Sequence, residues 1–208
     1  MTAHSQYPGV PIELVHLADA LEAGLPANEA HGWPEAFVSA IEPSANLSLV
    51  WPRWAHWLLT VELAPYVTDR IRQAVYRVQC AYAQRVSGEP VGDAEWTRAA
   101  MEAGAEAAGA ARRADEEENG EAAWEVRASG AEDENEAAMA NSAATDARAA
   151  AAVARMEGWA AAWTKWVAEV AVAGALAEWV AEEEGVAGVA GAYQRMADQL
   201  LMLLREAR

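Results

Sequence analysis

The sequence contains a single cysteine, and it has no proline after Pro90. Cys80 has no second cysteine with which to form an internal disulfide, which favours an intracellular protein, and we expect a cytoplasmic location in a host cell. The N-terminus lacks a basic start followed by an apolar run, so we expect no signal peptide. No stretch of about 20 residues is apolar and free of charge, which predicts that no segment spans a membrane.

Motifs for metal, phosphate and nucleophile chemistry are also missing. The four histidines do not form an H-E-x-x-H pattern or a Cys–His framework, and the Gly-rich phosphate loops and G-x-S-x-G are absent. We interpret His16 and Asp19 as an ordinary surface pair rather than a metal site. No carboxylate pair stands out among the many acids. We therefore predict a protein that is not an enzyme and that uses no cofactor or metal.

The composition favours helix throughout. No segment shows the apolar–polar alternation of a strand, and alanine, which dominates the second half, loses no side-chain entropy on entering a helix. We predict an all-α fold, an antiparallel bundle of roughly seven to nine helices with an alanine-rich C-terminal half. The composition shifts near 88–93, which divides a helical region, 1–90, from an acidic alanine-rich bundle, 91–208. We expect the two to form one continuous globular unit.

Proline and glycine mark the expected helix ends. One helix should stop at Gly24, a short one should begin at Pro34, and another should begin at Pro52. An amphipathic helix is predicted within 65–88, with Gly88 as its C-terminal cap. Asp93 is predicted to cap the next helix. Further breaks are expected at the polar clusters 116–121, 129–135 and 182–185.

Ten tryptophans must supply much of the buried area, because alanine buries little. Trp159, Trp163 and Trp166 share one helix face, and core packing is favoured over the alternative of a surface that docks a partner. Trp54 and Trp57 are expected in the core, while Trp51 is left open. We expect the tryptophans of 51–57 and of 159–166 to meet in one core, where each buried indole N–H needs an acceptor.

The most unusual feature is a block of acid within a chain of net charge -17. Between residues 115 and 136 there are ten acidic residues and a single basic one, Arg127. The acidic residues are Asp115, Glu116, Glu117, Glu118, Glu121, Glu125, Glu132, Asp133, Glu134 and Glu136. A solvated corner is the plainer interpretation. The alternative is an acidic ridge that occupies a nucleic-acid groove on a basic protein. Trp124, inside the block, either anchors a partner or pins this corner to the core.

Three phrases carry a resemblance. They are the stretch from Ala45 to Trp54 that contains "LVWPRW", the stretch from Asp93 to Trp96, and "YQRMADQLLMLL" from Tyr193 to Leu204. In these the chain resembles a group of alanine- and tryptophan-rich helical hypothetical proteins of bacteriophages and high-GC bacteria. Its alanine-rich half is similar in style to helical immunity proteins of the Imm5-like kind. The resemblance implies a helical protein that acts in the conflict between phage and host or between toxin and antitoxin. It brings no known catalytic residues.

These observations favour a non-enzymatic acidic inhibitor, of the immunity or anti-CRISPR type. It would bind a basic nucleic-acid-binding effector, such as a nuclease, a CRISPR complex or a toxin, and block it as a DNA mimic, without binding nucleic acid or membrane itself. The expected partner-binding residues are Glu116, Glu117, Glu118, Glu121, Trp124, Glu132, Asp133, Glu134 and Glu136. A homo-oligomeric phage structural or assembly protein is the alternative, and a homodimer is left open.

Overall fold

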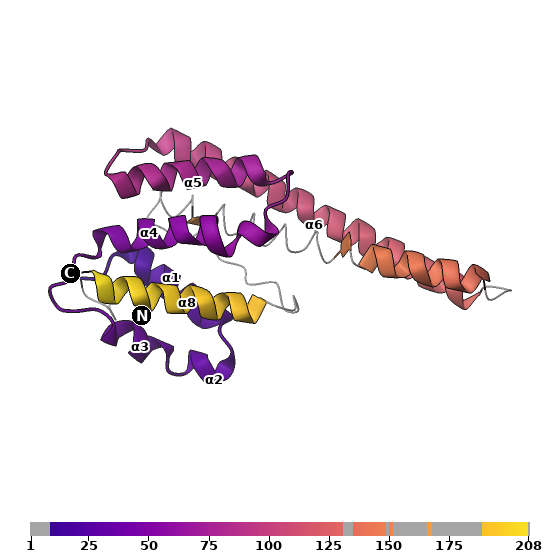
Figure 1. The fold of residues 1–208 in the computed structure, drawn as a ribbon, viewed down its shortest axis with the longest axis horizontal. Coiled ribbons are helices and arrows are strands. Elements are labelled where there is room, and N and C mark those ends of the chain that lie inside the picture. Colours follow the sequence, from indigo (N-terminus) through magenta and orange to yellow (C-terminus); the bar gives the residue numbers. More distant parts are fainter. Residues whose placement is uncertain (1–8, 131–134, 149, 152–165, 168–188, 208) are drawn as a thin grey trace.

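A computed structural model of the chain describes residues 9–130, 135–148, 150–151, 166–167 and 189–207 (Figure 1). The fold is all-α: the described residues form helices and turns, with no strand among them. The predicted fold class is therefore confirmed. The helix break predicted at 182–185 and the tryptophans Trp159 and Trp163 lie outside the described residues.

The N-terminal helices are short because prolines and glycines interrupt them. They are α1 (Ile12–Gly24), α2 (Ala27–Ala30) and α3 (Trp33–Ser39). As predicted, α1 ends at Gly24, and Pro34 lies in the first turn of α3, where its missing N–H costs nothing. Gly24 also has a packing role, since a Cβ built there would lie 2.1 Å from Cε1 of Tyr193.

A central helix follows. A 3-10 turn (Leu47–Leu49) leads into α4 (Val50–Trp57), which continues as a π-helical stretch (Leu58–Glu62) and a second 3-10 turn (Ala64–Tyr66). Within the π-helical stretch, the Leu59 carbonyl accepts a hydrogen bond from the side chain of Gln79, whose Nε2 lies 2.7 Å away. Figure 1 shows α4 between α5 (Arg72–Ser87) and α8 (Val189–Glu206), and both pack against it.

Tryptophans fill much of this core, and three of their indole N–H groups donate hydrogen bonds inside it. Trp33 Nε1 donates to the Ala18 carbonyl at 2.9 Å, and Trp54 Nε1 donates to the Met196 carbonyl at 3.0 Å. Trp51 Nε1 donates to the Tyr82 hydroxyl at 3.1 Å. For Trp33, Trp51 and Trp54 the buried indole thus has the acceptor that its desolvation requires.

The two tryptophan groups meet as expected where the structure describes them. The rings of Trp51 and Trp166 lie edge to face, with centroids 5.6 Å apart, and both side chains are buried. Trp51, which the sequence left open, is thus a core residue, and so is Trp54. Trp57 is only half-buried and packs against the edge of the core.

Helix α5 begins later than predicted. Its expected span started near residue 65, but residues 64–66 form the 3-10 turn and Val67 is extended, with ψ 96°, so regular helix starts at Arg72. The other end is as predicted, because Gly88 closes it in the left-handed conformation (φ 86°) that glycine adopts without steric cost.

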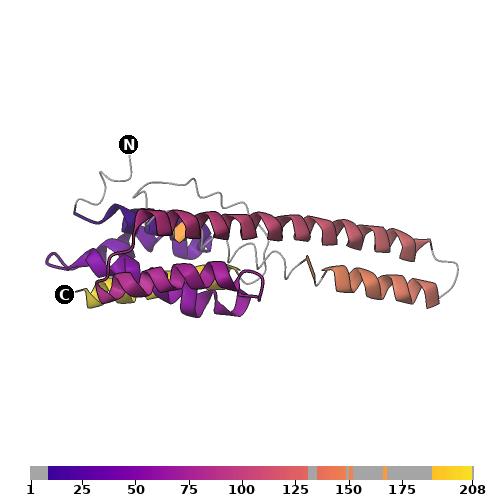
Figure 2. The same ribbon diagram turned by 90° about the horizontal axis from the view of Figure 1, so that it is seen from above.

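Helix α6 (Asp93–Ser129) has 37 residues, which corresponds to about 55 Å (Figure 2). Two predictions about it are wrong. Asp93 is the first helical residue, and the cap is Gly92, without a side-chain hydrogen bond. Asp93 instead places its charge in the first turn, where the helix dipole favours an anion. The break expected at 116–121 is absent as well, since the helix continues through Gly120 to a stop at Ser129, within the predicted 129–135 cluster.

Candidate functional site

The first part of α6 belongs to the core, and its second part stands away from it. Trp96, Ala99 and Ala100 join the same buried cluster as the tryptophans of α4. Beyond them α6 extends outward, and the helical residues 135–148 run back beside it (Figures 1 and 2). We call residues 115–129 and 135–148 the helical arm. Seven of the ten carboxylates of the acid block lie on this arm.

The seam of the arm is built from alanine. Ala140 and Ala144 of the returning segment are buried, and so are Ala110 and Ala114 on α6 just before the arm begins, each pair with a spacing of four residues. Small side chains at this spacing let two helix axes approach closely. Gly120 adds no strain, because its φ is not positive and a Cβ there would contact nothing within 4 Å. The cost of one glycine in a helix, about 1 kcal/mol, is small against this pairing, which explains why α6 does not break.

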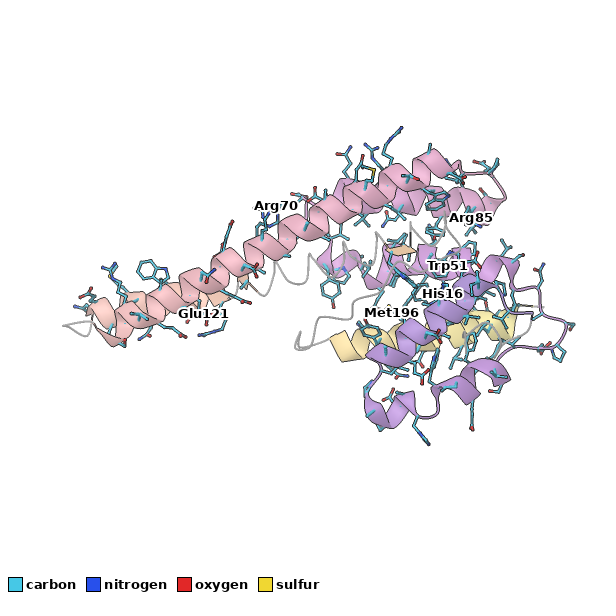
Figure 3. All side chains as sticks on the ribbon, turned by 180° about the vertical axis from the view of Figure 1, so that it is seen from behind. His16, Trp51, Arg70, Arg85, Glu121 and Met196 are labelled. Atoms are coloured by element: carbon cyan, nitrogen blue, oxygen red, sulfur yellow. The ribbon has the colours of Figure 1, made fainter. Side chains whose placement is uncertain are left out.

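Ion pairs fix the two helices in an antiparallel register. Arg148 Nε donates to Glu121 Oε1 at 2.7 Å, and its Nη2 donates to Glu125 Oε1 at 2.9 Å. Nearer the tip, Arg127 Nη2 lies 3.5 Å from Glu136 Oε1. Figure 3 shows Glu121 on the side of α6 toward the returning segment, and only 18% of its side chain is exposed. Glu121, Glu125 and Glu136 therefore take part in holding the arm together.

The helix distributes the remaining carboxylates around its circumference. Successive residues are turned by about 100°, so Glu116 and Glu118 lie on nearly opposite sides of α6. Asp115, Glu116 and Glu117 are exposed, and no ion pair of theirs occurs within the described residues. The arm thus carries carboxylates on several faces rather than in a single ridge. Glu132, Asp133 and Glu134 lie outside the described residues.

Trp124 is an exposed aromatic on this arm. Its side chain is 38% exposed, whereas the tryptophans of the core are almost fully buried. The Arg127 guanidinium carbon lies 5.5 Å from the centre of its ring, a cation–π contact. Trp124 does not belong to the buried cluster that holds five of the described tryptophans, so it does not pin the arm to the core.

Sequence reasoning missed one neighbour, Met139, which is 76% exposed on the returning segment. Glu136 and Met139 are three residues apart on that helix, and Trp124 and Arg127 are three apart on α6, so each pair forms surface neighbours. The Arg127–Glu136 pair joins the two pairs across the seam. Only the antiparallel register brings Met139 to the side of Trp124, and no local pattern in the sequence signals it.

The other side chains that could bind a metal or transfer a proton do not form a site in the described part of the chain. No cluster of three or more His, Cys, Asp or Glu side chains suited to a metal occurs in the described ranges. His16 and Asp19 lie on α1, where burial raises the pKa of Asp19 and the nearby His16 charge opposes this rise. The one buried carboxylate in the described part of the chain, Glu62, is held by Arg195 through two hydrogen bonds of 2.9 and 2.6 Å.

Within the described ranges, no helix combines the length and apolar character that a membrane span requires. No protein-family model, curated protein or solved structure matches the chain.

Proposed function

We propose that the protein is a non-enzymatic inhibitor that uses its helical arm to bind a basic protein effector. The observation that carries this proposal is the concentration of charge. Residues 115–151 contain eleven acidic side chains against two arginines, a net charge of -9 out of -17 for the whole chain. Eight of these acidic side chains lie on the two paired helices of the arm, which stands away from the core, so that a partner can approach them from several sides.

This arrangement costs stability, which is an argument for a use. Like charges at helical spacing destabilise a helix by a few tenths of a kcal/mol per pair. On α6 such pairs are Asp115–Glu118, Glu117–Glu121 and Glu118–Glu121. An acidic arm steers a basic partner toward it over about the Debye length and speeds association. The partner class that fits best is a nucleic-acid-binding effector, such as a nuclease, a CRISPR complex or a toxin, whose basic groove the arm would occupy in place of nucleic acid.

The test is affinity capture from host cells, read by mass spectrometry, at about 0.1 M and about 0.5 M salt. We expect a basic nucleic-acid-binding protein that is retained at the lower salt and weakened at the higher. The decisive variant is Glu116→Lys with Glu117→Lys, two exposed residues of the arm. Its matched control is Glu22→Lys with Glu42→Lys, which makes the same change in net charge at exposed positions outside the arm.

The arm variant should slow association with the captured protein, and the control variant should not. Equal effects from both variants would mean that net charge alone acts and would contradict a role for the arm. Self-association without a foreign partner at either salt would favour the alternative, a homo-oligomeric assembly protein.

A further inference from the structure

Near the tip of the arm, two exposed apolar side chains lie on the same side of the helix pair. Trp124 contacts Arg127, Arg127 pairs with Glu136, and Met139 is the surface neighbour of Glu136. We call these four residues the Trp124–Met139 patch. Its centre is an ion pair whose charges cancel, and its two ends are apolar, 38% and 76% exposed.

The patch is held in place before any partner arrives. The guanidinium of Arg127 lies over the indole, 5.5 Å from its centre, and is paired at the same time with Glu136 of the opposite helix, so it restrains the Trp124 ring. Restraint of an aromatic side chain in the free protein reduces the entropy lost on binding. Tryptophan is the residue most enriched among binding hot spots, and a flexible methionine beside it adapts to the shape of a partner's side chain.

Val126 provides an internal comparison. It is 72% exposed and lies on the same arm, but two residues after Trp124, so about 200° separates them around the helix. Val126 is therefore an exposed apolar residue outside the patch. An effect of general apolar surface on the arm would involve Val126 and Met139 alike, whereas an effect of the patch would involve Met139 alone.

The surrounding charge decides what covers the patch. A second copy of the chain would bring another arm, with eight acidic side chains against two arginines, a net charge of -6, against the first, and the two would repel. Glu117 lies seven residues, about two turns, before Trp124 and hence on nearly the same face, and it is exposed. A partner that carries apolar side chains flanked by lysine or arginine satisfies both parts of this surface.

We propose that the Trp124–Met139 patch binds the apolar stripe of a basic amphipathic helix of the partner, an inference that rests on the function proposed above. The carboxylates around the patch attract the basic residues of that helix and set the association rate. The patch itself holds the apolar residues, so it sets the dissociation rate and discriminates among basic partners.

Two synthetic peptides of equal length and equal lysine content serve as probes. One places leucine at helical spacing between the lysines, and the other has glutamine at those positions. Binding of each to the full-length protein is measured by fluorescence anisotropy at about 0.1 M and about 0.5 M salt. We expect the leucine peptide to bind at least about tenfold more tightly. Trp124→Ala and Met139→Ala should each reduce that advantage severalfold, and Val126→Ala should leave it unchanged.

Each other outcome overturns the inference. If both peptides bind equally and salt weakens both, the patch has no role, although the acidic arm retains the function proposed for it. If the leucine peptide keeps its advantage in both Trp124→Ala and Met139→Ala, it binds elsewhere. A dimer in sedimentation equilibrium that Trp124→Ala dissociates would show that a second copy covers the patch. Met139→Ala, at a mostly exposed position, keeps the test valid if Trp124→Ala perturbs the fold, which circular dichroism reports.

Discussion

The hydroxyl of Tyr82 joins two segments of the core, and its removal tests how the tryptophans are held. Tyr82 is fully buried on α5. Its hydroxyl accepts a hydrogen bond from Trp51 Nε1 at 3.1 Å and donates one to the carbonyl of Val167. Tyr82→Phe therefore deletes one oxygen and leaves two buried polar groups without this partner, an indole N–H and a backbone carbonyl.

The expected loss follows from those two groups. A buried donor or acceptor left unsatisfied costs about 1–3 kcal/mol, and the shape of the side chain hardly changes, so no large cavity adds to it. We expect Tyr82→Phe to lower the free energy of unfolding by about 2–6 kcal/mol, the sum of the two penalties. The control is Tyr76→Phe on the same helix, at a residue 62% exposed, where we expect a change within about 0.5 kcal/mol.

Urea denaturation of the full chain, followed by circular dichroism, measures both variants. Trp51→Phe in the Tyr82→Phe background removes the stranded donor, so the double variant should lose less than the sum of the two single changes. A loss below about 1 kcal/mol for Tyr82→Phe, or strict additivity in the double variant, would refute this account of the core.

The loss of stability at alkaline pH tests the same hydroxyl. Burial raises the pKa of Tyr82 above its ordinary value of 10.0, so the folded state holds this proton more tightly than the unfolded state does. The stability that this group contributes is complete below pH 10 and is lost as the pH rises further. In Tyr82→Phe this part of the alkaline loss should be absent.

Two glycines should respond in opposite directions. Gly24→Ala places a methyl group 2.1 Å from the ring of the buried Tyr193, so we expect destabilisation by about 1–3 kcal/mol in urea denaturation, and an unchanged midpoint would contradict the packing of α1 on α8. Gly120→Ala meets nothing within 4 Å inside a continuous helix, so we expect stabilisation by about 0.5–1 kcal/mol, and a loss of stability would instead indicate the break that the sequence had suggested.

The helix termini show how far local chemistry predicts this fold. The stop at Gly24, the proline at the start of α3 and the left-handed cap at Gly88 each follow from the conformational preference of one residue. The prediction was wrong at 116–121, because a glycine within a polar cluster is a weak signal. The antiparallel partner of α6 outweighs it through contacts that are distant in sequence.

The candidate site divides in the same way. Its charge could be read from the sequence, because ionisable residues keep their charge wherever they lie. The faces that they occupy could not, because they depend on whether α6 is continuous. The inclusion of Met139 and the use of Glu121, Glu125 and Glu136 in holding the arm depend on the register of two helices, which is set by long-range packing.

By itself the sequence determined that the protein is helical, where several helices end, and that the acid is concentrated in one block. Alanine content, proline positions and net charge act locally or add up regardless of fold. Only the tertiary structure decided which acceptors the indole N–H groups find. Trp54 donates a hydrogen bond to Met196, 142 residues away, and Trp51 donates one to Tyr82, 31 residues away. It also decided that Trp124 faces solvent. Such contacts join segments far apart in the chain, and they form only when the helices pack.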